Sequence, residues 1–182
     1  MRHILITGVP GIGKTTLIQN IIKKLKDIDV ELDGFYTQEY RNERNQRLGF
    51  EIVVIQNNKR GILADKSNAA STNDVRKLGQ YTVYVKNFEE LVFPIISTFN
   101  KKLLVIDEIG KMELFSKKFE HIIGVAFTSN KFLIVATVPA KGPPFVEKLK
   151  RNTSNQLFTV YENNREGLAN DILSTVKAEL RL

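Results

Sequence analysis

The sequence of 182 residues has no cysteine, no long apolar run and no block of like charge. Without cysteine it can form neither a disulfide framework nor a cysteine-ligated zinc site. No apolar run approaches the ~20 residues that span a bilayer, so we expect no membrane partner. The first residues, MRHILITG, pass from a short apolar stretch straight into a glycine motif, unlike a signal peptide. These absences favour a cytoplasmic protein, with the nucleus as the alternative.

The charge is basic but dispersed. Lys and Arg outnumber Asp and Glu by 27 to 20, which gives a formal net charge of +7. Such a surface attracts polyanions, either a nucleotide or a nucleic acid. Most basic residues are scattered singly and are not interleaved with aromatic residues, so nucleic acid is allowed as a partner but not favoured. The chain contains no internal repeat, linker or low-complexity segment, and we expect residues 1–182 to form a single, monomeric domain.

Apolar periodicity predicts strands that alternate with helices. Two aromatic and β-branched runs around a polar stretch predict an antiparallel hairpin. Together these patterns indicate an α/β fold: a mainly parallel sheet with helices on both faces and the hairpin as an antiparallel insertion. The expected strands are 3–7, 34–40, 49–56, 81–85, 103–106, 132–138 and 157–161; the expected helices are 14–26, 88–99 with a kink or break at Pro94, 116–127 capped by Ser116, and 168–180.

The segment between the first expected strand and helix, GVPGIGKT, matches all eight positions of the P-loop pattern. Its glycines let backbone N–H groups approach phosphate oxygens, and the following helix presents its N-terminal amides to the same anion. Lys14 can reach the β- and γ-phosphates, the Thr15 hydroxyl can ligate Mg²⁺, and Thr16 would lie near the α-phosphate. The predicted phosphate site comprises Gly8, Val9, Pro10, Gly11, Ile12, Gly13, Lys14, Thr15 and Thr16.

Two acidic residues follow the buried strand 103–106. Asp107 would hold Mg²⁺, directly or through water, as an acid at a strand end downstream of a P-loop does. Glu108 would orient or deprotonate a water that attacks the γ-phosphate. The alternatives are a turn cap for Asp107 and a supporting or surface carboxylate for Glu108. The pair favours hydrolysis over phosphoryl transfer to another acceptor.

No motif identifies the cation that would neutralise charge in the transition state. Lys111 is the best candidate because it lies three residues after Glu108, although an ordinary surface charge is the alternative for every candidate. Thr137 could touch the γ-phosphate or the attacking water, or simply be a buried strand residue. The loop Asn163-Asn164-Arg165 could contact the base, or Asn164 could cap the last helix. The other candidate cations are Arg41, Arg47, Lys141 and Arg151.

The motifs GVPGIGKTTL, DGFYTQEYR and VIDEIGKMELFS, with IVATVP and ENNRE, resemble the small nucleoside-triphosphatase family first described from thermophiles, which has a human member called cancer-related nucleoside-triphosphatase. The resemblance spans nearly the whole chain. It implies a RecA-like fold in which the strand ending at Thr137 lies between the P-loop strand and the Asp107 strand. It also implies slow, Mg²⁺-dependent hydrolysis of ATP, GTP and other nucleoside triphosphates. The nucleotide-binding segments that it implies are Gly8–Thr15 and Leu103, Leu104, Val105, Ile106, Asp107, Glu108, Ile109 and Gly110.

Two other functions fit part of the sequence. A nucleoside or nucleotide kinase would need an acceptor pocket, which the hairpin of residues 35–56 could build. A nucleotide-dependent switch acting on RNA or a protein partner would bind tightly and hydrolyse slowly. Glu108 favours water as the acceptor and therefore a hydrolase. The hairpin turn 44–47 departs from the glycine-containing run that the family often has, which weakens the case for Arg41 and Arg47.

Overall fold

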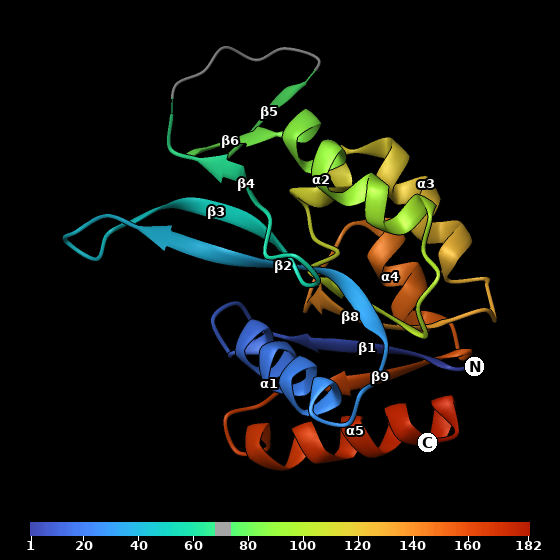
Figure 1. Ribbon diagram of the computed structural model, residues 1–182. Helices are drawn as coiled ribbons and strands as arrows, with labels where there is room; N and C mark the ends of the chain where they lie inside the picture. The colour runs from blue at the N-terminus through green and yellow to red at the C-terminus, as the bar shows by residue number, and fades with distance from the viewer. Residues whose placement is uncertain (68–73) are drawn as a thin grey trace.

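The computed structural model describes residues 1–67 and 74–182. They form one nine-stranded sheet in the order β5-β6-β4-β3-β2-β7-β8-β1-β9, with helices on both faces (Figure 1). The strands are β1 (His3–Gly8), β2 (Leu32–Arg41), β3 (Arg47–Val54), β4 (Arg60–Asp65), β5 (Val75–Leu78), β6 (Tyr81–Tyr84), β7 (Leu103–Asp107), β8 (Leu133–Pro139) and β9 (Asn155–Thr159). The helices are α1 (Lys14–Lys26), α2 (Val85–Ser97), η1 (Glu113–Phe115), α3 (Lys117–Ala126), α4 (Pro144–Arg151) and α5 (Arg165–Leu180).

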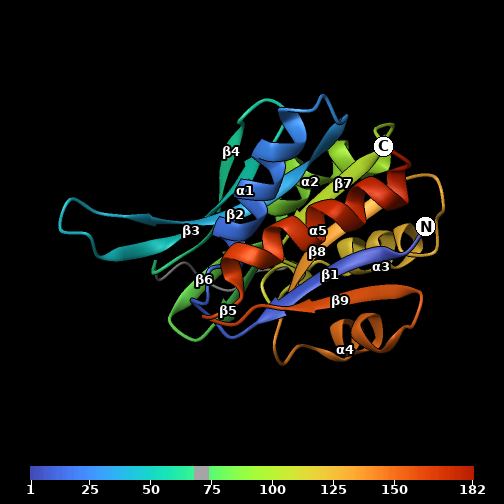
Figure 2. The ribbon, with the colours of Figure 1, turned by 90° about the horizontal axis from the view of Figure 1, so that it is seen from below.

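Strands β2, β7, β8, β1 and β9 are paired in parallel and form one half of the sheet. Their side chains alternate between two cores: Ile4 and Ile6 pack with α1 and α5, whereas Leu5 packs with α2, α3 and α4. Figure 2 shows α1 and α5 side by side across one face. Because parallel strands end at the same edge, the segments after β1, β7 and β8 come together there. β8 lies between β1 and β7, as the resemblance implied.

The other half of the sheet is antiparallel and larger than the expected hairpin. β2 runs on past the end of β7, and its outer part pairs with β3; β4, β6 and β5 follow in the ladder. The sheet is therefore mixed, with the expected hairpin as its projecting arm (Figure 1). This arm leaves the sheet at the same edge as the P-loop, because β2 is parallel to β7, and β7, β8 and β1 are parallel in turn.

The helices and the last strand also differ in detail from the sequence-based expectation. α2 continues unbroken through Pro94, because its stripe of Phe88, Val92 and Ile96 is buried in the core and holds both halves of the helix. α4 was not expected; it begins at Pro144, a residue suited to a first helical turn. β9 lies two residues earlier than expected. The Ser116 cap is confirmed, since its hydroxyl accepts a hydrogen bond from the Phe119 N–H (3.0 Å). Of the helices in the described ranges, none is long and apolar enough to cross a bilayer.

Candidate nucleotide site

The P-loop lies where β1 passes into α1. Gly11 and Gly13 have φ angles of +79° and +100°, which only glycine adopts at little cost. Gly13 occupies the N-cap position of α1, so the first-turn amides of the helix receive no side-chain cap. Unpaired amides at a helix N-terminus, together with the helix dipole, form an anion site. The local backbone thus has the geometry that a phosphate-binding loop requires, and phosphate binding by these residues stays a prediction.

Lys14 joins the P-loop to the acidic motif. Its Nζ donates a hydrogen bond to the Gly8 carbonyl oxygen (3.1 Å) and lies 3.5 Å from Oε2 of Glu108. The lysine side chain is only 10% exposed, whereas that of Glu108 is 32% exposed. Residues nearly a hundred positions apart therefore meet at the edge of the sheet. The folded chain brings together the lysine expected to bind phosphate and the expected base.

Asp107 is 1% exposed, on the α1 side of β7. The Thr137 hydroxyl donates a hydrogen bond to its Oδ1. Its Oδ2 is buried, and no group in residues 1–67 and 74–182 lies at hydrogen-bonding distance. Burial raises the pKa of Asp107 to about 6, while the hydrogen bond from Thr137 and the nearby hydroxyl of Thr15 oppose the rise. A buried, unpartnered carboxylate oxygen near a threonine hydroxyl fits a divalent cation.

Asp107 and Thr15 suit a Mg²⁺ ion that the protein shares with a nucleotide better than they suit a metal bound by protein ligands alone. In the described part of the chain, no cluster of three or more His, Asp or Glu side chains could hold an ion. Mg²⁺ commonly takes one or two protein ligands together with substrate phosphates and water. Asp107 and Thr15 match that pattern. Thr137 is fully buried and supports Asp107, so it acts on the site through that carboxylate.

Glu113 lies beside the candidate site, and the sequence reasoning missed it. It is 4% exposed, and its Oε2 accepts a hydrogen bond from the Gly110 N–H (3.1 Å). A Cβ atom on Gly110 would lie 2.8 Å from Oε1 of Glu108 and 2.9 Å from Oε2 of Glu113, so two carboxyl groups meet around this glycine. Burial, and then the negative charge of Glu108, raise the pKa of Glu113 to about 8. The sequence did hold a signal for this residue, because an acidic residue stands between the apolar residues of KMELF.

Lys150 was also missed. Its Nζ donates hydrogen bonds to the carbonyl oxygens of Pro139 (3.3 Å) and Ala140 (2.8 Å) and pairs with Glu147 (2.8 Å). Pro139 is the register partner of Gly8, so Lys150 fixes the loop that runs beside the P-loop. The spacing of Glu147 and Lys150 at i and i+3 was a usable signal, although only once a helix was expected there.

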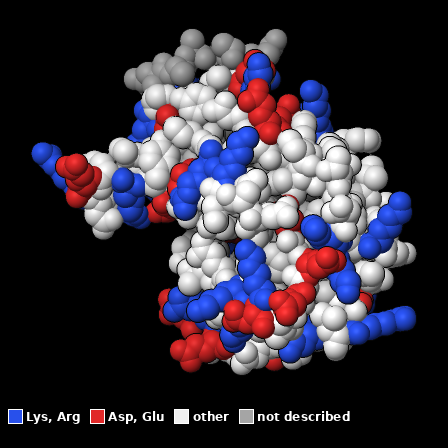
Figure 3. Space-filling model, viewed as in Figure 1, with Lys and Arg blue, Asp and Glu red and all other residues white. Residues whose placement is uncertain are grey.

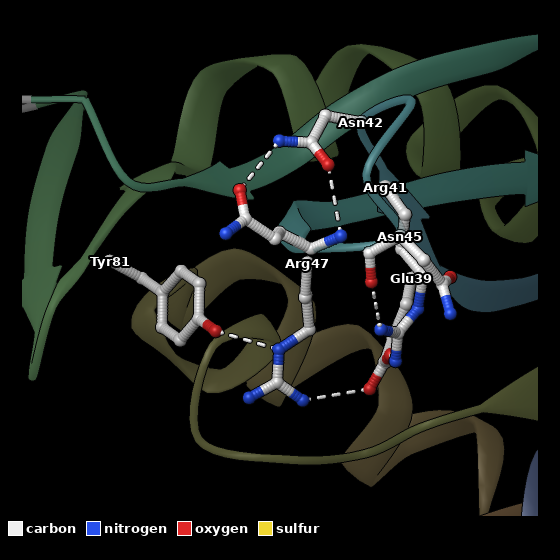
Figure 4. Close-up of polar contacts among 7 residues, drawn as sticks. Glu39, Arg41, Asn42, Asn45, Arg47 and Tyr81 are labelled. Carbon is white, nitrogen blue, oxygen red and sulfur yellow. Dashed lines mark hydrogen bonds and ion pairs between the residues drawn. The ribbon is translucent and has the colours of Figure 1, made fainter.

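The candidate cations lie in three different surroundings. Arg41 and Arg47 both pair with Glu39 on the hairpin arm, at 2.5 and 2.8 Å, and Nε of Arg47 donates to the Tyr81 hydroxyl (2.9 Å; Figure 4). Their charges are therefore engaged within the arm. Lys111 and Lys141 are exposed, in the turn after Gly110 and in the loop after β8. Arg151 donates to a backbone oxygen of its own helix, α4.

The loop between β9 and α5 is held by Asn164. Its Oδ1 accepts from the Tyr161 N–H (2.8 Å), and its Nδ2 donates to the Thr159 carbonyl oxygen (2.9 Å). Asn164 stands at the N-cap of α5, but its side chain makes no capping hydrogen bond. Its amide is therefore occupied by the loop itself. Arg165 is exposed, and its Nη1 donates to the Ile12 carbonyl oxygen of the P-loop (3.3 Å).

Comparison with known proteins adds to this geometry. A family model described as NTPase matches residues 3–173. The nucleoside-triphosphatase THEP1 of Thermotoga sp. (strain RQ2) is 43% identical over 176 residues, covering 96% of this chain and 95% of that protein. The cancer-related nucleoside-triphosphatase homolog of Mus musculus is 35% identical over 186 residues, with 97% of each chain covered. The crystal structure of THEP1 from Aquifex aeolicus matches with a TM-score of 0.83 at 35% identity, covering 97% of this chain and 99% of that one.

Proposed function

Because this chain belongs to the nucleoside-triphosphatase family, we propose that it hydrolyses ATP, GTP and other nucleoside triphosphates to the diphosphate and phosphate, with Mg²⁺ and with little regard for the base. The observation that carries this proposal is the 3.5 Å approach of Lys14 to Glu108 beside the buried Asp107. It supports the proposal because the three side chains to which the proposal assigns phosphate binding, proton acceptance and metal binding lie at one edge of the sheet.

Each residue has a separate role in this proposal. The P-loop amides and Lys14 bind the β- and γ-phosphates. Asp107 and Thr15 would hold Mg²⁺, which supplies neutralising charge to the phosphate oxygens. Glu108, partly exposed and therefore accessible to water, orients the nucleophilic water and accepts its proton. Glu113 and Thr137 hold the segment after β7 in place: Glu113 accepts from the Gly110 N–H, and the Thr137 carbonyl accepts from the Ile109 N–H (2.9 Å).

The test is a phosphate-release assay over ATP, GTP, CTP and UTP, with Mg²⁺ and with EDTA. We expect release from all four substrates, and its loss in EDTA. Lys14→Ala should lower kcat/KM by roughly 10³-fold. If wild-type protein releases phosphate from none of the four, the proposal is wrong.

Two added components separate the rival functions. Nucleosides and nucleoside monophosphates should leave the rate unchanged; acceptor-dependent formation of ADP would instead identify a kinase. RNA should also leave the rate unchanged, and strong stimulation by RNA would identify a switch. Lys and Arg side chains are interspersed with Asp and Glu on the face shown in Figure 3, over both the body and the hairpin arm, which supports the expectation that RNA has no effect.

A further inference from the structure

The order of the strands gives the bound nucleotide a direction, provided that the proposed function holds. Asp107 ends β7 and Glu108 follows it, and β7 lies two positions from β1 on one side. The γ-phosphate must face these residues to be hydrolysed. β9 lies next to β1 on the opposite side. A triphosphate laid along the P-loop with its γ-phosphate toward β7 therefore extends its nucleoside toward the loop between β9 and α5.

This loop is built against the P-loop. The Val160 N–H donates to the Thr7 carbonyl oxygen (2.8 Å), and a Cβ atom on Gly8 would lie 3.0 Å from the Val160 carbonyl oxygen. A Cβ atom on Gly13 would lie 3.4 Å from Nη1 of Arg165. Both ribbon views place the loop before α5 at the same end of the sheet as the P-loop (Figures 1 and 2). A nucleoside leaving the P-loop on this side meets residues 160–165.

Tyr161 offers an aromatic ring at this position. It is 59% exposed, the most exposed of the large hydrophobic side chains in the described ranges. Its backbone is nevertheless fixed, because its N–H donates to Asn164, which is itself bound to Thr159. A solvated ring on a fixed loop can stack with a planar base without a large loss of conformational entropy.

We propose that the base of the nucleoside triphosphate stacks on Tyr161, and that Arg165 faces the α-phosphate from the outer side of Gly13. Nη1 of Arg165 already contacts Ile12, and a guanidinium has five N–H donors, so donors remain for a phosphate oxygen. Stacking on an aromatic ring accepts any base, because every base has a π-face. The amide of Asn164 is engaged within the loop. The site therefore takes purine and pyrimidine nucleotides alike, with purines bound more tightly through their larger ring.

The experiment compares nucleotides with a ligand that lacks a base. KM and kcat for ATP, GTP, CTP and UTP, and the inhibition constant of inorganic tripolyphosphate, are measured for wild type, Tyr161→Ala, Tyr161→Phe and Arg165→Gln. We expect Tyr161→Ala to raise KM for the nucleotides about tenfold, with kcat and the tripolyphosphate constant unchanged. Tyr161→Phe keeps the ring and should stay within about twofold of wild type. Arg165→Gln should weaken the binding of both the nucleotides and tripolyphosphate.

Val125→Ala is the matched control, because Val125 is 58% exposed on α3, which covers the sheet face opposite α1 and α5. An unchanged KM in Tyr161→Ala overturns the proposal. So does an equal loss of tripolyphosphate binding, since that would mean that Tyr161 acts only through the shape of the P-loop. Calorimetric binding of Mg-ADP separates this inference from the proposed function: if wild type binds Mg-ADP without hydrolysing any triphosphate, the tenfold loss in Tyr161→Ala still tests the base site.

Discussion

In the proposed hydrolysis, Glu108 is the residue on which the rate should depend most directly. Glu108→Gln keeps the size and hydrogen-bonding shape of the side chain but cannot accept a proton from water. We expect kcat for ATP to fall about 100-fold or more, with KM changed only a few-fold, because general-base catalysis contributes at this level. Phosphate release at saturating ATP measures the effect. Glu43→Gln, at the exposed tip of the hairpin arm, is the control. A rate equal to wild type would remove Glu108 from the mechanism.

Glu113 predicts a pH dependence of stability. Its pKa in the folded protein is raised to about 8 from 4.5, so between these values the folded chain keeps a proton that the unfolded chain has lost. The free energy of unfolding therefore falls as the pH rises through this window, by up to about 1.4 kcal/mol per unit. Glu113→Gln retains an acceptor for the Gly110 N–H but cannot ionise.

Thermal unfolding of wild type and Glu113→Gln between pH 5 and pH 8 checks this expectation. The variant should match wild type near pH 5 and become progressively more stable than wild type toward pH 8. Asp107 also has a raised pKa, but it is present in both proteins, so the comparison largely removes its contribution. Parallel curves for the two proteins across the whole range would show that Glu113 does not titrate there.

Among the elements, the junction of β2 and β7 tolerates the least change. Gly34 has φ +144°, and a Cβ atom there would lie 1.9 Å from the Val105 carbonyl oxygen of the neighbouring strand. Gly34→Ala must therefore push the two strands apart, and we expect a loss of roughly 3 kcal/mol or more in unfolding free energy. Gly167→Ala in α5 is the control, because a Cβ atom there meets nothing within 4 Å. The control should be neutral or up to about 1 kcal/mol more stable. Denaturant unfolding of both variants distinguishes them.

The elements that the sequence predicted are those whose signal is local. The first strand and the first helix, between His3 and Lys26, were confirmed because apolar periodicity and the contiguous glycine motif between them specify their positions together. β4, β5 and α4 are short and half-exposed, so they carry little periodicity, and their positions depend on the neighbours that they pair with. The continuity of α2 through Pro94 also depends on packing. Burial of the apolar stripe of this helix outweighs the tendency of proline to break it.

The residues of the candidate site also divide into those that a local motif predicted and those that the sequence reasoning missed. Lys14, Asp107 and Glu108 were predicted because a motif fixes their spacing, and the fold then places Lys14 beside Glu108. Glu113 and Lys150 were missed because they bind backbone groups of other segments, and no periodicity of side chains records such a partner. The roles assigned to these residues, the single domain, the monomer and the cytoplasmic location stay predictions.

For the whole molecule, a bound nucleotide should link the P-loop to Asp107 and thereby stabilise the folded chain. The P-loop follows β1 and Asp107 ends β7, and β8 lies between them, so a ligand that contacts both links three strands of the sheet. Any ligand that binds only the folded chain stabilises it, by about 2.7 kcal/mol at a hundred times its Kd. For a chain of this size, that corresponds to a rise in Tm of roughly 5–11 °C with Mg-ADP.

Three conditions separate the contributions to this rise: ADP with Mg²⁺, ADP with EDTA, and Mg²⁺ alone. We expect the full shift only with ADP and Mg²⁺ together, and a smaller one in EDTA, because the P-loop amides and Lys14 still bind phosphate without the metal. In Asp107→Asn, ADP should raise the Tm equally with and without Mg²⁺. This variant lacks the buried carboxylate whose Oδ2 has no protein partner within the described ranges. Asp171→Asn, on the exposed face of α5, should behave as wild type. If EDTA leaves the wild-type shift intact, Asp107 does not hold a metal that bridges the nucleotide to β7, and its burial serves the core alone.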